Sequence, residues 1–325
     1  MDNYTNNIKI IQKGAHLGAE VVGVDLTKTV NDRVFNIIEE AFVEYEVLIF
    51  RKQRINSSQQ IAFAKNFGNL SVHPFSPNSD DTPELIIFDN DAENPPFGTD
   101  CWHTDETFRA DPPMATMLHG LIIPEVGGDT VFASMTSAYE GLSDRMKNFI
   151  SGLECVHDFK PFRALFGADK KSKADLRYFE DLYPPVVHPV VRKHPVSGKP
   201  VLFVNPQFST KIKGMSDVES MALLNLLFEQ AKTPEFQLRH HWAVDTLVVW
   251  DNRSTQHYAV HDYFPQRRKL DRVTIQGDKV IPYTIAADPK LVKNNKSSLP
   301  DNPIVKHGGH APKRQFVRAF DTEEH

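Results

Sequence analysis

The sequence predicts a mainly β fold with decorating helices, of the β-barrel or jelly-roll kind. Short segments with a strand pattern recur along the chain, separated by clusters of turn residues. Segments of helical period are fewer and concentrate early in the chain. Candidate metal ligands lie on remote segments, at His103, Asp105 and His257. The interior of a jelly-roll brings such sequence-remote segments together.

The composition is that of an ordinary globular protein, and it excludes several classes. The 325 residues are 40% hydrophobic and 24% charged, which is ample apolar material for a core. The formal net charge of -5 argues against a nucleic-acid partner or an anionic membrane surface. The two cysteines, Cys101 and Cys155, are too few for a disulfide framework or a thiolate metal cage.

The sequence shows no signal for export or membrane insertion. The first seven residues lack the charged and apolar regions of a signal peptide. No apolar run approaches the roughly 20 residues that span a bilayer. We therefore expect a cytoplasmic protein without a membrane partner, and we leave open whether it forms a homo-oligomer.

The N-terminal part mixes strand and helix patterns. Residues 8–26 alternate in polarity and are broken by glycines, which predicts short strands joined by turns. Residues 31–45 carry an apolar stripe of helical period, with Asn31 or Asp32 as the N-cap. Residues 47–50 are a short apolar run that predicts a buried strand.

A second helix and three strands follow. Asn56 opens the helix, and Gly68 stands where a C-cap glycine is expected. Residues 85–88 predict an apolar strand. Residues 114–123 and 130–133 predict strands on either side of a glycine turn.

The C-terminal half continues with short strands and one clear helix. Residues 134–153 are expected to be helical. A capping box at Ser216 and Glu219 opens a further helix. The remaining strands are expected at residues 186–192, 201–205, 246–250 and 271–276.

We expect one domain and a tail. Residues 1–283 are assigned to the single domain, and residues 284–325, which contain few large apolar residues, to a C-terminal extension. Within the domain, residues 160–183 are charged and show no clear period. They are interpreted as a mobile insertion or a lid over the site.

The pair His103 and Asp105 is the strongest chemical signal in the sequence. Residues two apart on an extended strand point to the same face, so both side chains reach one metal ion. A second histidine from a distant strand, His257, completes a 2-His-1-carboxylate set, which leaves metal positions open and is typical of non-haem Fe(II) oxygenases. His261, four residues on, is the alternative ligand, but the residues preceding His257 favour His257.

The chain resembles the taurine dioxygenase family of Fe(II)- and 2-oxoglutarate-dependent dioxygenases, over about residues 8–283. The resemblance implies a double-stranded β-helix core, iron bound by His103, Asp105 and His257, and 2-oxoglutarate and O2 as co-substrates. The motifs that carry it are Trp102-His103-Thr104-Asp105, Gly127-Gly128-Asp129-Thr130, His194-Pro195-Val196-Ser197-Gly198-Lys199, Trp250-Asp251-Asn252-Arg253, Gln256-His257-Tyr258, Pro265-Gln266-Arg267-Arg268 and the stretch from Arg272 to Asp278.

The resemblance also assigns the co-substrate residues. Arg268 corresponds to the family's arginine for the far carboxylate of 2-oxoglutarate, and a guanidinium grips a carboxylate through two bonds. Thr130 corresponds to the family's threonine and follows two glycines that allow close backbone approach. Arg268 and Arg272 share a face on a strand, whereas the adjacent Arg267 is expected at the surface. A second buried arginine requires a second anion, which we infer to be the acidic group of the substrate.

His73, Arg272 and Phe208 match positions that contact the substrate in taurine-specific members. Ser76 and Thr99 stand where those members carry partners for the amino group, which makes taurine itself doubtful. A small acid with an apolar body fits better, with Phe208 as one wall of its pocket; Phe75 and Phe162 are further candidate walls.

The expected function is hydroxylation of a small anionic organic compound, with succinate and CO2 as co-products. An alkylsulfonate or an alkyl sulfate ester is the preferred candidate, and its hydroxylation releases sulfite or sulfate together with an aldehyde. Two alternatives stay open. One is the same chemistry on another acid, such as an aryloxyalkanoate or a biosynthetic intermediate. The other is a non-catalytic jelly-roll that senses a ligand.

Overall fold

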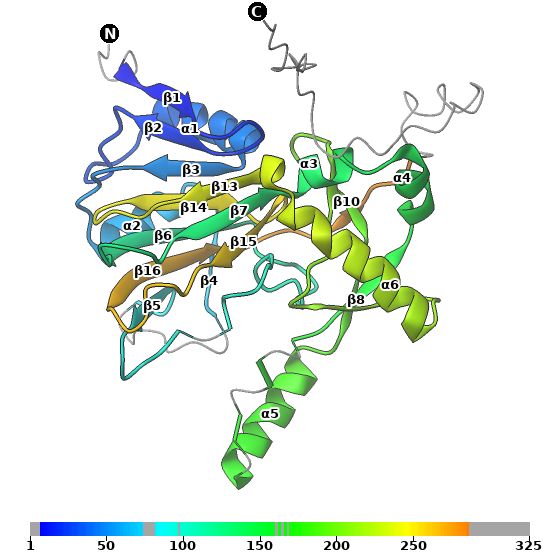
Figure 1. Ribbon diagram of the computed structural model, residues 1–325. Coiled ribbons are helices and arrows are strands. Elements are labelled where there is room, and N and C mark those ends of the chain that lie inside the picture. The colour runs from blue at the N-terminus through cyan, green and yellow to red at the C-terminus, as the bar shows by residue number, and fades with distance from the viewer. Residues whose placement is uncertain are drawn as a thin grey trace, which may run out of the picture.

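The computed structural model describes residues 7–73, 82–96, 98–159, 162–163, 166–167 and 169–285. Two groups of strands form its body, and helices lie on the outside (Figure 1). The helices are α1 (Asp32–Tyr45), α2 (Ser57–Ala64), α3 (Met135–Glu140), α4 (Asp144–Ile150), α5 (Lys170–Leu182), α6 (Asp217–Phe228), and the 3-10 helices η3 (Glu229–Lys232) and η4 (Pro234–Phe236).

The largest sheet combines strands from both ends of the chain. Its strand order is β1-β2-β3-β14-β6-β16-β4, and β5 also pairs with β16. Neighbours are antiparallel, except that β2 and β3 are parallel. The bounds are β1 Lys9–Gln12, β2 Ala19–Val22, β3 Val47–Phe50, β4 Leu70–Ser71, β5 Leu85–Asn90, β6 Ala115–Ile122, β14 Leu247–Asp251 and β16 Arg268–Ile275.

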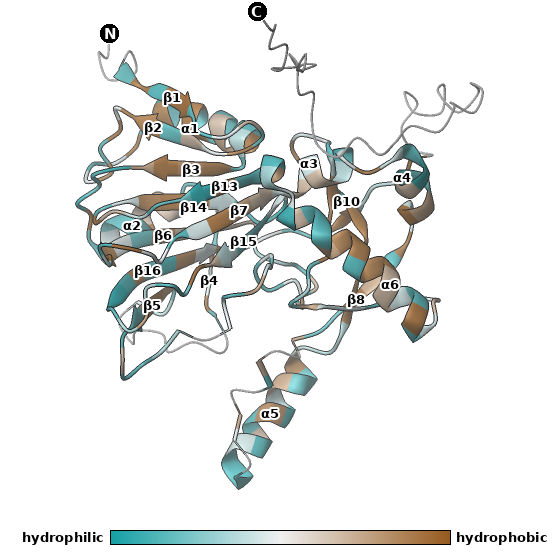
Figure 2. Cartoon of the chain, viewed as in Figure 1, coloured by the Kyte–Doolittle hydropathy of each residue, from teal (hydrophilic) through white to brown (hydrophobic). Residues whose placement is uncertain are grey.

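Alternate residues of the central strands enter two different apolar clusters, because successive side chains of a strand point to opposite faces. In β14, Leu247 and Val249 pack into the cluster that contains residues of α1 and α2. Val248 and Trp250 of the same strand belong to a second cluster on the opposite face. In β3 every residue is buried, and Figure 2 shows this strand as uniformly hydrophobic. The helices α1 and α2 therefore cover one face of the largest sheet.

A second, three-stranded sheet covers the other face. β7 (Thr130–Ser134) lies between β13 (Gln237–His240) and β15 (Thr255–Ala259), with antiparallel pairing throughout. Phe132 of β7 contacts Trp250 of β14, with ring centroids 5.4 Å apart. The two sheets thus enclose a common interior, and the predicted β-rich jelly-roll is confirmed.

The remaining strands form two small sheets beside α3 and α6. Buried leucines of α6, Leu224 and Leu227, belong to an apolar cluster that also contains Val201 and Ile212 of these small sheets. The strands of these sheets are β8 Glu154–His157, β9 Val186–Pro189, β12 Ser209–Ile212, β10 Val191–Lys193, β11 Pro200–Leu202 and β17 Ile281–Pro282.

The predicted helix starts are confirmed. Asn31 accepts a hydrogen bond from the amide of Val34 at the start of α1. Asn56 and Ser216 each form a full capping box, at the starts of α2 and α6. The predicted end of α2 was wrong, because the C-cap residue is Lys65 and the chain turns before Gly68.

Other corrections concern segments without a clear period. Residues 134–153 form two helices, α3 and α4, because Ser143 accepts from the amide of Met146 and starts a new helix. Within residues 160–183 the chain forms the helix α5, capped by Asp169, where an irregular segment was expected. None of the residues of α5 is buried, and the helix projects from the body of the molecule (Figure 1). Strands β4, β8, β12, β13 and β17 were not predicted.

None of the described helices has the length and apolar character that crossing a bilayer requires. The predicted tail lies outside the described residues from residue 286 onward.

Candidate active site

A short backbone bridge joins two of the three predicted metal ligands. The amide of His103 donates to the carbonyl oxygen of His257 at 3.0 Å, and the amide of His257 donates to the carbonyl oxygen of His103 at 2.8 Å. His257 lies on β15, whereas His103 forms an isolated bridge and a turn follows from Asp105. The prediction that one strand carries both His103 and Asp105 was wrong. The turn, rather than strand alternation, brings the carboxylate to the site.

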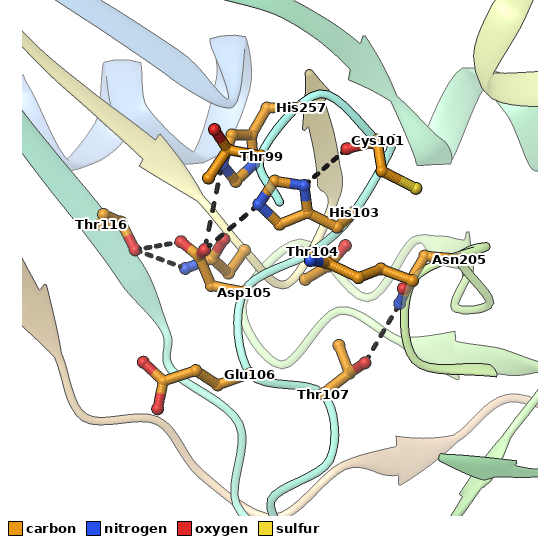
Figure 3. Close-up of polar contacts among 12 residues, drawn as sticks. Thr99, Cys101, His103, Thr104, Asp105, Glu106, Thr107, Thr116, Asn205 and His257 are labelled. Atoms are coloured by element: carbon orange, nitrogen blue, oxygen red, sulfur yellow. Dashed lines mark hydrogen bonds and ion pairs between the residues drawn. The ribbon is translucent and has the colours of Figure 1, made fainter. Parts of the chain in front are cut away.

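The three side chains converge on one buried point. The Nε2 atoms of His103 and His257 lie 3.7 and 3.9 Å from Oδ1 of Asp105. All three ligand atoms lie within 4.8 Å of one another, and Figure 3 shows Asp105 directed at both imidazoles. Two imidazoles and one carboxylate form the donor set of non-haem Fe(II) sites. The residues present therefore fit Fe(II).

The protonation states of the histidines suit metal binding. Nδ1 of His103 lies 2.7 Å from the carbonyl oxygen of Cys101 and donates to it, so that Nε2 carries the free lone pair. Burial lowers the pKa of His103. Burial and the neighbouring His103 hold the pKa of His257 well below its ordinary value. Both imidazoles are therefore neutral near pH 7, the form that binds a metal.

Asp105 is held by a chain of buried polar groups. Oγ1 of Thr116 donates to Oδ2 of Asp105 at 2.5 Å, and Nδ2 of Asn252 donates to the same hydroxyl at 3.0 Å. Burial raises the pKa of Asp105, but Arg272, the two imidazoles and Thr116 outweigh it and bring the pKa below the ordinary value. The carboxylate is therefore ionised near pH 7.

A cavity of about 380 Å³ opens onto the three ligands. Arg268 and Arg272 of β16 both line it, as their spacing predicted, and both are buried. His73, Thr130 and Phe208 line it as well. The structure thus brings together all the predicted site residues around one cavity.

The surroundings of Arg268 fit one end of a dicarboxylate. Its guanidinium lies between the rings of Trp242 and Tyr263, at 5.7 and 5.6 Å from the ring centroids. Among the described residues, none offers its Nε a hydrogen-bond acceptor. Thr130 accepts a hydrogen bond from Nε1 of Trp242 at 3.0 Å, which leaves the hydroxyl hydrogen of Thr130 available for a ligand.

Gly128 permits this arrangement. A Cβ atom at Gly128 would lie 3.1 Å from Cδ of Arg268, and the backbone there has a φ of +72°. Both constraints favour glycine. The glycine pair that precedes Thr130 therefore allows the close approach that the sequence suggested.

Arg272 has anionic neighbours within the chain. Its Nη2 atom lies 3.2 Å from Oδ2 of Asp105 and 3.8 Å from Oε1 of Glu106. The acidic group of the substrate was inferred from the sequence as the anionic partner of this arginine, and these two carboxylates were not foreseen. His73 is buried, with Nε2 also 3.8 Å from Oε1 of Glu106, and burial lowers the pKa of His73 to about 4. His73 is neutral near pH 7 and offers a hydrogen bond rather than a charge.

The apolar side of the cavity is aromatic. Phe208 is 1% exposed and packs on Phe108, with ring centroids 5.4 Å apart, so it is a core residue that also lines the cavity. Phe162 lies beside it and lines the cavity too. The predicted positions Ser76 and Phe75 lie outside the described residues.

Two further predictions concern the alternative ligand and the surface arginine. Nε2 of His261 forms a hydrogen bond with Oγ1 of Thr99 at 2.9 Å, and His261 is not part of the metal-ligand cluster. Arg267 binds Asp89 at the surface with its side chain 52% exposed, as predicted.

The motif Trp250-Asp251-Asn252-Arg253 contains a buried ion pair between Asp251 and Arg253. Arg253 donates two hydrogen bonds to the Asp251 carboxylate, at 2.8 and 2.6 Å. His194 contacts the same carboxylate at 3.0 Å. Two of the motifs singled out in the sequence therefore meet in one buried ion pair.

Sequence reasoning missed four residues of the site: Trp242, Tyr263, Thr116 and Glu106. The first three come from segments outside the motifs recognised in the sequence, and only the folding of the chain brings them to the site. Glu106 was missed for a local reason. On the expected strand it would face away from the site, whereas the actual turn, with φ of +49° at Glu106, places its carboxylate in the cavity wall.

Comparison with known proteins identifies similar chains. Residues 9–274 match the model of the family described as "Taurine catabolism dioxygenase TauD, TfdA family". The chain is 35% identical to an alkylsulfatase of Acinetobacter baylyi, over 86% of this chain and 88% of that one. It is 33% identical to an alpha-ketoglutarate-dependent 2,4-dichlorophenoxyacetate dioxygenase of Cupriavidus pinatubonensis, over 81% and 96% of the two chains. A crystal structure of a putative alpha-ketoglutarate-dependent taurine dioxygenase from Burkholderia xenovorans superposes with a TM-score of 0.74 and 34% identity, and covers 85% and 94% of the two chains.

Proposed function

Because this chain belongs to the TauD, TfdA family of Fe(II)- and 2-oxoglutarate-dependent dioxygenases, we propose that it hydroxylates a small organic acid. The leading candidate is an alkylsulfonate or an alkyl sulfate ester. Hydroxylation of the carbon next to the sulfonate sulfur or the ester oxygen gives an unstable product. That product releases sulfite or sulfate and leaves an aldehyde, while 2-oxoglutarate (alpha-ketoglutarate) is converted to succinate and CO2.

Each part of the site has a separate task. His103, Asp105 and His257 would hold the iron, and the bound metal supplies activation of O2. Arg268 and Thr130 would bind the far carboxylate of 2-oxoglutarate, one through its guanidinium and the other through its hydroxyl. The aromatic wall formed by the partly buried Phe162 and the buried Phe208 excludes water from the reacting carbon.

The observation that carries the substrate proposal is the position of Arg272 and His73. Both are buried, both line the cavity that the triad opens onto, and the Arg272 guanidinium lies 3.2 Å from Asp105. An acidic group held there would place its α-carbon near the metal ligands. The similarity to a relative named alkylsulfatase supports a sulfate ester.

A second candidate is the same chemistry on an aryloxyalkanoate. The relative named for 2,4-dichlorophenoxyacetate favours it, since its identity to this chain is close to that of the alkylsulfatase. The aromatic wall of the cavity would accommodate an aryl ring. A non-catalytic ligand sensor is not supported, because the chain retains the complete triad and the similar chains carry dioxygenase or sulfatase names.

The test is succinate formation from 2-oxoglutarate with Fe(II) and O2, measured across alkylsulfonates, alkyl sulfate esters and aryloxyacetates. We expect stimulation by a sulfonate or sulfate ester and release of sulfite or sulfate. Asp105→Ala should abolish it. Stimulation by aryloxyacetates alone would overturn the sulfur-acid proposal and favour the second candidate.

A further inference from the structure

Glu106 presents an unused hydrogen-bond acceptor to the cavity. The residue is 2% exposed, and its Oε2 atom accepts from Nε of Arg109 at 2.6 Å. Its other oxygen, Oε1, lies 3.8 Å from both His73 and Arg272 and has no hydrogen-bond partner among the described residues. Figure 3 shows the Glu106 side chain directed away from the His103 imidazole. A buried carboxylate oxygen without a donor is costly, so this position favours a ligand that supplies one.

The same oxygen changes the character of the proposed acid subsite. Arg272 is the cation of that subsite, but it already faces the carboxylates of Asp105 and Glu106. His73 adds no charge when it is neutral. A plain anion bound at this point therefore meets the Arg272 guanidinium but also Oε1 of Glu106, while Arg109 binds the other oxygen of that carboxylate. An acid that also carries a donor satisfies both, because its anionic group binds Arg272 and its donor binds Glu106.

We propose that Glu106 is a specificity-determining residue, which selects acids that bear an ammonium or hydroxyl group close to the acidic group over acids with a purely alkyl body. The inference rests on the proposed function, since it takes Arg272 and His73 as the acid subsite. It narrows the substrate class to amino- or hydroxy-substituted small acids. Glu106 also supplies an acceptor for an amino group, at a position other than Ser76 and Thr99, the two positions considered in the sequence.

Three compounds of nearly equal size test the proposal. In 2-aminoethanesulfonate, 2-hydroxyethanesulfonate and 1-propanesulfonate, an ammonium, a hydroxyl and a methyl group occupy the same position. Their dissociation constants are measured by titration calorimetry on the enzyme loaded with Fe(II) and 2-oxoglutarate, without O2. Succinate formation with O2 gives the corresponding kcat/KM values.

The wild-type protein should bind the amino and hydroxy compounds more tightly than 1-propanesulfonate. Glu106→Gln keeps the shape and an acceptor oxygen but removes the charge, so the preference for the ammonium should fall about tenfold or more, and that for the hydroxyl less. Glu106→Leu should reverse the order in favour of the methyl group. Asp89→Asn removes a carboxylate from another part of the cavity wall and should leave the ranking unchanged.

The outcomes separate this inference from the proposed function. If sulfonates are turned over but both Glu106 variants rank the three compounds as the wild type does, the role of Glu106 is refuted and the substrate class stands. An equal change of the ranking in Asp89→Asn would also refute the role of Glu106, because the change would then follow from the loss of any negative charge near the cavity. If no sulfonate binds, the alkylsulfonate part of the proposed function fails, and the comparison is repeated with 3-aminopropanoate, 3-hydroxypropanoate and butanoate. Absence of binding in both series would overturn the inference.

Discussion

His103 and His257, far apart in the sequence, are joined by two reciprocal backbone hydrogen bonds of 3.0 and 2.8 Å. The pairing fixes two metal ligands before any metal is bound, and the only ligand outside it is Asp105. The position of that carboxylate depends on side-chain contacts, among them the hydrogen bond from Thr116 and the ion pair with Arg272.

Thr116→Val should therefore weaken metal binding. The substitution keeps the shape but removes the hydroxyl that donates to Asp105 and accepts from Asn252. We expect the apparent affinity for Fe(II) to fall about 10- to 100-fold, the usual effect of losing a group that orients a ligand. Metal titration of the apoprotein measures it. Ser220→Ala, which removes a buried hydroxyl bonded to Ile212, is the control for stability alone; an equal loss of affinity there would contradict the prediction.

Two adjacent arginines should differ sharply in their effect on 2-oxoglutarate. Arg268 is buried in the cavity wall, whereas Arg267 binds Asp89 at the surface. Arg268→Met should raise the KM for 2-oxoglutarate roughly 100-fold, and Arg268→Lys should recover only part of it, because an ammonium does not grip a carboxylate through two bonds. Steady-state kinetics with Arg267→Met as the matched control should show an unchanged KM. A similar KM for 2-oxoglutarate in both methionine variants would refute the assignment of Arg268 to the carboxylate.

Phe208 should contribute to stability more than to substrate choice. It is 1% exposed and packs against Phe108 and Phe162. Phe208→Ala should lower the free energy of unfolding by about 3–5 kcal/mol, through lost contacts and a cavity. Denaturant unfolding measures the change. Phe149, which is 55% exposed, provides the control, and Phe149→Ala should be nearly neutral. Comparable losses for the two variants would show that Phe208 is not a core residue.

Glu46 predicts a pH dependence of stability. Burial raises the pKa of its carboxyl from 4.5 to about 8, against the hydrogen bonds of Ser134 and Thr136, which lower it. Between about pH 4.5 and pH 8 the folded protein keeps a proton that the unfolded chain has released. The contribution of Glu46 to the free energy of unfolding is therefore fully present below about pH 4.5. Between that pH and about pH 8 it falls by about 1.4 kcal/mol per pH unit.

Glu46→Gln should remove this slope. We expect the variant to gain stability relative to the wild type as pH rises from 5 to 8, when both are unfolded in urea at each pH. Parallel curves for the two proteins over that range would contradict the shift. Glu39 is an exposed residue of α1, the helix that Glu46 follows as C-cap, and Glu39→Gln is the matched control.

Much of the architecture could be predicted because local signals and burial agree. Residues 47–50 are four consecutive apolar residues between a helix end and a polar loop, and they form the buried strand β3 as predicted. Asn31, Asn56 and Ser216 start helices because their side chains satisfy free backbone amides. The ligands His103, Asp105 and His257 were identified by their residue types and context, even though the strand expected for two of them was wrong.

The rest depended on pairings that the sequence does not display. Helix α5 fully buries none of its residues, and its short apolar stripe, Leu176 and Phe179, was not recognised among the charged residues around it. The anionic neighbours of Arg272 come from the turn at Asp105 and Glu106, whose conformation is not encoded in a simple period. Trp242 reaches Thr130 from the loop between β13 and β14, and no spacing in the sequence indicates that hydrogen bond.

The turn that follows His103 has a consequence for how such enzymes diverge. The histidines are fixed by backbone hydrogen bonds, which are indifferent to side-chain identity, whereas Glu106 contributes to the cavity through its side chain alone. A single codon change at Glu106 can therefore alter the compounds that fit while the backbone pairing of the iron ligands is retained. A scaffold of this kind acquires new substrates by small mutational steps, without passing through forms that have lost the metal.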